Sequence, residues 1–398
     1  MTPERADRRP RVALVLTGGG ARGAYQVGVL RGLGMTFPDL RFPILTGVSA
    51  GAINAVYLAL RPEPLGETSR RLVEIWRGIE IDDVIRGDWS WLTGNFLRWG
   101  ARLGLGGHGP KARALLDTAP LRRTLAGFVQ DPSGQIGGID RNIEAGRLDA
   151  IALSAVHYGT GQTVQWVQAK EGAFEPWSAP NRVARRTRLT LDHVMASSSL
   201  PLIFPAVQLR DGWYGDGGIR MAAPLSPALR LGADRLLVIS TRYPRSLDEA
   251  RQPVFQCYPS PAQIGGHLMN SIFLDLVDQD IARLERINEL VARLPPERRG
   301  KMRLIDFDVV RPSADLGKMT ENVTARLPKG FRFLHRGLGS GDPKSPDFLS
   351  LLMFQSDYME PLIDLGIRDA LARSEDFRRL LEPEDDSPSA VPDSDSDP

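Results

Sequence analysis

The sequence has very little cysteine and no long apolar run. Cys257 is the single cysteine among 398 residues, so no disulfide can form within the chain, which fits a reducing compartment. No apolar run is long enough to span a bilayer. The apolar stretch at 11–16 is too short for the core of a signal peptide and runs directly into glycines. We therefore expect a cytoplasmic protein and leave open a peripheral contact with a membrane.

Metal-ligand motifs and dense basic blocks are missing as well. The residues show no metal-ligand spacing, so we expect no metal and no other cofactor. Lys and Arg form no dense block, and we expect no nucleic-acid partner. The formal charge of +2 is unevenly spread, because residues 382–398 hold seven acids and no base. This tail is rich in Pro, Ser and Asp, a composition that predicts disorder.

The body of the chain alternates between strand and helix patterns. Apolar runs at 11–16 and 42–48 are typical of buried strands, and helix patterns follow them at 23–33 and 50–60. This alternation predicts an α/β fold with three layers, in which helices cover both faces of a mostly parallel central sheet.

Later segments extend this prediction. We expect further strands at 149–157, 162–169, 234–240 and 302–309, the first two joined as a hairpin through the YGTG turn. Long helices are expected at 275–294 and 350–373.

These patterns divide the chain into an N-terminal extension (1–10), a catalytic domain (11–245), a mainly helical extension packed on that domain (246–381) and the acidic tail (382–398). An insertion at about 79–135 holds Trp89, Trp91 and Trp99. Its tryptophans fit core packing, and they also fit an acyl-binding wall, a lid or a membrane contact.

The first motif is a glycine loop after the first strand, GGGARG at 18–23. Such a loop at the start of a helix points backbone N–H groups at an anion. A dinucleotide site also needs an acid about 20 residues further on, at the end of the second strand. The nearest acid, Asp39, instead precedes that strand, and no Lys-Ser/Thr follows the glycines as a P-loop requires.

The second motif is G-x-S-x-G at 47–51, which places Ser49 between an apolar strand and a helix of small residues. This is the pattern of a nucleophile elbow, where a sharp turn exposes a serine hydroxyl. If the two strands are parallel, the glycine loop and Ser49 lie at the same edge of the sheet. We therefore expect the loop to hold the oxyanion of an ester beside the nucleophile.

The third motif, DGG at 216–218, offers a base for Ser49. Asp216 lies in a glycine turn that exposes it, although an isolated turn of this kind would normally cap its own backbone. A carboxylate with an ordinary pKa near 3.9 is a poor base, so Asp216 must be partly desolvated to raise its pKa. We expect an Asp base to keep activity to lower pH than a His base.

Taken together and in this order, GGGARG, GVSAG and DGG resemble the patatin-like phospholipase family. MASSSLPLIFPAV at 195–207 and the hairpin Thr160–Val164 add to the likeness, which covers about residues 11–241. Ala222 and Ala223 stand where many members have Asn or Thr before the proline.

The resemblance implies a serine acyl-ester hydrolase that acts on lipids, with Ser49 as nucleophile and Asp216 as base. Since no metal cluster is visible, we expect no dependence on calcium. It also implies an oxyanion hole formed by the loop residues Gly18, Gly19, Gly20, Ala21, Arg22 and Gly23. We expect Arg22 to position this loop, and the alternative is that it binds a phospholipid phosphate. The expected partner is a lipid or acyl-ester substrate, and the sequence does not indicate an oligomeric state.

Two alternatives remain open from the residues. One is a Ser-His-Asp esterase that uses one of five histidines, of which His335 is nearest to a glycine-flanked loop; the others are His108, His157, His193 and His267. The other is a module without chemistry that binds a nucleotide or lipid through Gly18–Gly23.

Overall fold

The computed structural model describes residues 10–86, 114–129, 134–221, 223–251, 264, 276–322 and 350–382. Its strands are β1 (Val12–Leu16), β2 (Ile44–Gly47), β3 (Ala150–His157), β4 (Gln162–Ala169), β5 (Trp177–Ala179), β6 (Arg182–Arg186), β7 (Val207–Leu209), β8 (Gly212–Asp216), β9 (Arg235–Ile239) and β10 (Asp306–Val310).

Its α-helices are α1 (Gly23–Thr36), α2 (Ala50–Leu60), α3 (Leu65–Gly78), α4 (Ile81–Val84), α6 (Ala119–Val129), α7 (Gly137–Glu144), α8 (Leu191–Ser197), α9 (Ser226–Arg230), α10 (Leu247–Arg251), α12 (Leu276–Ala292), α15 (Ser356–Ala372) and α16 (Ser374–Leu381). Short 3-10 helices are η2 (Gly20–Arg22), η3 (Gly217–Arg220), η4 (Pro296–Arg298) and η5 (Lys318–Asn322).

The described strands form a single mixed sheet in the order β10-β9-β1-β2-β3-β4-β6-β5, with β8 paired to β3 and β7 to β8. The run from β10 to β3 is parallel throughout, and β3 and β4 form the expected antiparallel hairpin. Leu16 at the end of β1 is in register with Gly47 of β2 and Ile239 of β9. The loops that follow these three strands therefore lie at one edge of the sheet.

Helices cover both faces of this sheet, as the uninterrupted apolar runs predict. In β1, Leu14 and Leu16 belong to the core under α1, α2, α3 and α15, whereas Ala13 and Val15 belong to the core under α9 and α12. Both faces of the strand are thus dry, which explains why its sequence does not alternate. The α/β fold with a mostly parallel central sheet is confirmed.

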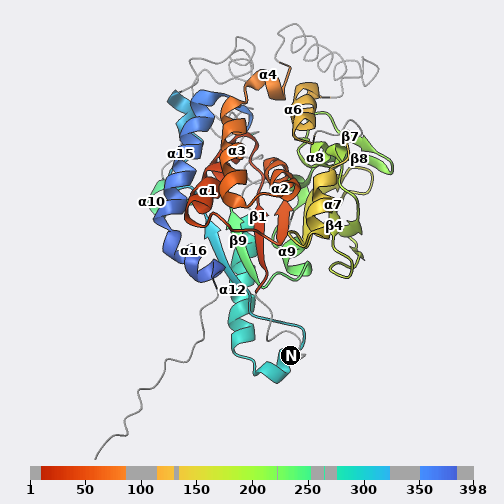
Figure 1. Cartoon of the computed structure of the whole chain (residues 1–398), viewed down its shortest axis with the longest axis vertical. Coiled ribbons are helices and arrows are strands. Elements are labelled where there is room, and N and C mark those ends of the chain that lie inside the picture. The colour runs from red at the N-terminus through yellow and green to blue at the C-terminus, as the bar shows by residue number, and fades with distance from the viewer. Residues whose placement is uncertain are drawn as a thin grey trace, which may run out of the picture.

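Helix α15 lies along α1 in very close contact on one flank of the molecule (Figure 1). A Cβ at Gly28 would lie only 2.1 Å from the Ile363 carbonyl oxygen, and one at Gly366 only 2.3 Å from that of Tyr25. Glycine at these two positions lets the helix backbones touch. Residues 246–381 also add a strand, β10, beside β9.

Several sequence predictions fall partly outside the described residues. These are Trp89, Trp91 and Trp99, most of the 79–135 insertion, and residues 1–9 and 383–398. From the insertion the structure describes α4 and α6, which lie together at one end of the molecule (Figure 1). The strand predicted at 302–309 begins later, at Asp306. None of the helices in the described segments is long and apolar enough to cross a bilayer.

Candidate active site

Ser49 occupies the sharp turn between β2 and α2. Its φ of 56° and ψ of −129° are unusual for a residue with a side chain, so the turn stores backbone strain. Glycine at position 51 permits the turn, because a Cβ there would lie 2.3 Å from the Leu16 carbonyl oxygen. The Ser49 carbonyl begins α2 by accepting a hydrogen bond from the Ala52 N–H at 2.9 Å. This geometry is that of the predicted elbow.

Three consecutive serines, from the last residue of α8 onward, tie this turn to Asp216. The N–H of Ser49 points at Ser197, whose carbonyl oxygen and Oγ each lie 3.2 Å away. Ser198 Oγ donates to the Ser49 carbonyl at 3.2 Å. The carbonyl of Ser199 accepts the Asp216 N–H at 2.9 Å. The segment 197–199 therefore holds both candidate catalytic residues through their backbones, a function that the sequence analysis did not predict.

Asp216 reaches the same edge from the antiparallel strand β8. Its carboxyl is completely buried, and Oδ1 accepts the Gly218 N–H at 2.8 Å. Burial raises its pKa to about 7, and the Ser49 hydroxyl and the Gly218 N–H act in the opposite direction. Oδ2 accepts no well-formed hydrogen bond from the described residues. The Ser49 hydroxyl therefore lies close enough to the Asp216 carboxyl to lower its pKa.

The glycine loop lies directly against the Ser49 side chain. A Cβ at Gly18 would lie 3.2 Å from the Ser49 Cβ. Gly19 and Gly20 have φ values of 157° and 55°, and the Arg22 N–H closes the turn onto the Gly19 carbonyl at 3.0 Å. Within the described part of the chain, the N–H groups of Gly18 and Gly19 donate to no acceptor. These N–H groups are therefore available as donors in the loop that packs on the serine.

A buried chain of polar side chains lies behind this loop. Gln26 donates to the Thr17 carbonyl at 2.7 Å, and its own side-chain oxygen accepts from Asn54 at 3.1 Å. Asn54 in turn accepts from the Trp76 indole N–H at 3.0 Å. All of these groups are buried, so breaking any link leaves an unpaired polar atom. The network fixes the end of β1 relative to α1, α2 and α3.

An apolar cavity of about 600 Å³, measured with its open mouth, begins at Ser49. Its apolar walls come from α3, α6 and residues 350–354, and include Trp76, Leu121, Leu125, Phe128, Leu351 and Phe354. Helix α6 belongs to the 79–135 insertion, so part of that insertion does line the cavity. The mainly apolar lining of this cavity suits a hydrocarbon chain.

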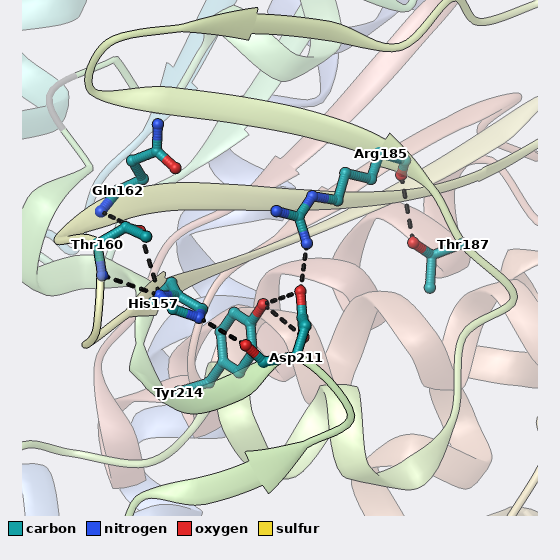
Figure 2. Close-up of polar contacts among 7 residues, drawn as sticks. All are labelled: His157, Thr160, Gln162, Arg185, Thr187, Asp211 and Tyr214. Carbon is teal, nitrogen blue, oxygen red and sulfur yellow. Dashed lines mark hydrogen bonds and ion pairs between the residues drawn. The ribbon is translucent and has the colours of Figure 1, made fainter.

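Histidine makes no hydrogen bond with Ser49 or Asp216 in the described residues. His157 accepts the Thr160 N–H at 3.0 Å through Nδ1, and its Nε2 lies 3.2 Å from the Asp211 carbonyl (Figure 2). Tyr214 and Arg185 both donate to the Asp211 carboxylate in the same network (Figure 2). Because Tyr214 pairs with His157 across β8 and β3, this network braces the strand that carries Asp216.

The second described histidine is also engaged elsewhere. His193 caps α8 by accepting the Thr190 N–H through Nδ1 at 3.1 Å, and its ring packs edge-on against Trp166. Burial lowers its pKa to about 4. His108, His267 and His335 lie outside the described residues. The described residues contain no group of three or more His, Cys, Asp or Glu that could hold a metal ion.

Comparison with known proteins places these motifs in a family. The patatin-like phospholipase model matches residues 14–229, more than half of the chain, and spans all three motifs. The chain belongs to the patatin-like phospholipase family. This confirms the resemblance seen in the sequence, and membership of this family supports lipid acyl hydrolase activity.

Solved structures resemble this patatin-like chain at low identity. Human GIVD cytosolic phospholipase A2 is 12% identical with a TM-score of 0.47, over 94% of this chain and 60% of the human one. VipD from Legionella pneumophila is 12% identical with a TM-score of 0.36, over 89% and 67%. ExoU, in its complex with SpcU from Pseudomonas aeruginosa, is 18% identical with a TM-score of 0.28, over 93% and 78%. No curated protein matches the chain.

Proposed function

We propose that this patatin-like protein hydrolyses acyl esters of lipids through a Ser49–Asp216 dyad. The observation that carries the proposal is the position of Ser49: a strained turn beside a buried carboxyl, two free N–H donors and an apolar cavity. Each of these features matches one requirement of acyl transfer, namely a displayed nucleophile, a base, an oxyanion hole and a site for the acyl chain.

The first half-reaction forms an acyl-enzyme. Ser49 Oγ attacks the ester carbonyl carbon while its proton passes to Asp216, whose carboxyl must be ionised to accept it. The carbonyl oxygen gains the negative charge and is held by loop N–H groups, those of Gly18 and Gly19 being free to donate. When the carbon–oxygen bond to the leaving alcohol breaks, the alcohol takes the proton from Asp216.

The second half-reaction uses water in place of the alcohol. A water molecule attacks the carbonyl carbon of the Ser49 ester while Asp216 takes a proton from that water. The same N–H groups hold the second oxyanion. Collapse releases the fatty acid and returns the proton to Ser49. A pKa near 7 suits both directions of transfer, because the carboxyl can accept and return a proton near neutral pH.

The test is hydrolysis of phospholipids, monoacylglycerols and p-nitrophenyl esters by the wild type, Ser49→Ala and Asp216→Asn. We expect turnover by the wild type and losses of about 1,000-fold or more in both variants, because nucleophile and base act as one unit. A fluorophosphonate probe should label Ser49 in the wild type alone. A folded wild type that hydrolyses none of these esters, or an active Ser49→Ala variant, overturns the proposal.

A further inference from the structure

Residues 350–354 lie far beyond the region matched by the family model, yet they contact the glycine loop. Ser350 is fully buried, and its Oγ accepts a hydrogen bond from Arg22 Nε at 2.7 Å. The next residue also touches the loop, because a Cβ at Gly20 would lie 2.0 Å from the Leu351 carbonyl oxygen. The C-terminal segment therefore contacts the loop at Gly20 and at Arg22.

Tyr358 lies close to this pair. Tyr358 at the start of α15 donates to the Leu316 carbonyl at 2.9 Å. Burial raises the pKa of the Tyr358 hydroxyl, and Arg22 and Ser350 both lie close enough to act against this rise. One buried polar group thus contains Arg22, Ser350 and Tyr358. Tyr358 belongs to α15, which packs closely on α1 at Gly28 and Gly366.

We propose that Ser350 is a positioning residue that holds the oxyanion loop in its working shape through Arg22. Arg22 is 3% exposed, and its backbone N–H closes the loop onto the Gly19 carbonyl. Anchoring the guanidinium therefore anchors the residue that closes the turn. Leu351 and Phe354 of the same segment form part of the cavity wall. This inference rests on the proposed acyl-ester hydrolysis.

The physical reason is that a glycine loop has no stiffness of its own. Glycine loses more conformational freedom on folding than any other residue, so a loop of three glycines needs contacts that select one shape. An oxyanion hole works only if its donors are oriented before the reaction. The buried hydrogen bond from Arg22 to Ser350 supplies one such contact across 328 residues of sequence.

The experiment measures kcat and KM on one p-nitrophenyl ester for the wild type, Ser350→Ala and Ser350→Cys. Cysteine keeps the approximate size of the side chain, but its sulfur is a weak acceptor. We expect both variants to lose about tenfold in kcat with KM unchanged, less than the roughly 100-fold loss when an oxyanion donor is deleted. The acid limb of the pH profile should stay in place, because Asp216 is not altered.

The control is Ser246→Ala, which removes a serine hydroxyl hydrogen-bonded to the Glu249 N–H at the surface. It should keep wild-type kcat. Arg22→Lys and the double variant Arg22→Lys/Ser350→Ala complete a thermodynamic cycle, and we expect the double variant to be no slower than the worse single one.

Three results overturn the inference while leaving the hydrolase intact: wild-type kcat in Ser350→Ala, wild-type kcat in Ser350→Cys, or additive losses in the cycle. Failure of the proposed function is distinguishable, since the wild type would then be inactive or Ser49→Ala active. Melting temperatures of all variants separate a loss of folded protein from a loss of kcat.

Discussion

The hydroxyl of Thr241 donates a hydrogen bond to the carbonyl of Gly18 at 2.7 Å, and both groups are buried. The Gly18 C=O and the Gly19 N–H belong to one planar trans peptide and point in opposite directions. By binding the Gly18 carbonyl, Thr241 orients the Gly19 N–H in the direction opposite to that carbonyl. Thr241 follows β9, outside the segment that the family model matches.

Thr241→Val keeps the shape of the side chain and removes the hydroxyl. We expect kcat to fall about tenfold with little change in KM, because the Gly18–Gly19 peptide loses its orientation, and stability to fall by about 1–3 kcal/mol. Thr68→Val is the matched control, since Thr68 also donates to a backbone carbonyl, that of Glu63, away from the site. Equal kcat values in the two variants would contradict this function of Thr241.

The pH profile follows from the burial of Asp216. With a pKa of about 7 in the free enzyme, the carboxyl is half ionised near neutrality, so kcat/KM should rise with pH through this range to a plateau above about pH 8. With this pKa, we no longer expect an Asp base to keep activity to lower pH than a His base, because burial moves the Asp216 pKa into the range of histidine.

Mutation must therefore decide which residue is the base. Each single His→Gln variant should keep most of the wild-type kcat/KM and the same fall in activity at acid pH. Asp216→Asn should lose nearly all activity. A folded histidine variant as inactive as Ser49→Ala would indicate a Ser-His-Asp triad instead.

Asp216 should also make the folded protein less stable at high pH. Its pKa is raised from 3.8 to about 7 on folding, so between these values the folded state keeps a proton that the unfolded state has released. Stability therefore falls as pH rises through this window, by about 4 kcal/mol at 1.36 kcal/mol per pKa unit.

Asp216→Asn removes this titration and keeps an acceptor for the Gly218 N–H. We expect its melting temperature to exceed that of the wild type at about pH 8 and to converge with it near pH 4. Thermal unfolding of both proteins across this range is the measurement. A lower melting temperature for Asp216→Asn at pH 8 would show that the ionised carboxyl carries no such penalty.

The cavity predicts a dependence on acyl-chain length. Leu125 of α6 lines it and is 4% exposed, so Leu125→Trp should fill part of the space beside Ser49. We expect kcat/KM to fall at least tenfold for long acyl esters and to change about twofold or less for short ones, with about 1–3 kcal/mol lost to overpacking. Leu371→Trp, at a position 40% exposed on α15, is the control. An equal loss on long and short esters would mean that the cavity does not hold the chain.

The sequence alone predicted the features that depend on short stretches of chain. The apolar runs at 11–16 and 42–48 are buried on both faces, so they are recognisable without their neighbours. The glycines around Ser49 and in the 18–23 loop mark turns that few other residues permit. Parallel pairing then sufficed to place both turns at one edge of the sheet.

Only the tertiary structure decided what surrounds those turns. Ser197, Thr241 and Ser350 are serines and threonines without a local signal, and their partners Ser49, Gly18 and Arg22 lie between 148 and 328 residues away in the sequence. The Asp216 pKa likewise depends on complete burial by several distant elements, which no spacing encodes. Local geometry is written in neighbouring residues, whereas orientation and desolvation come from contacts that exist only once the chain has folded.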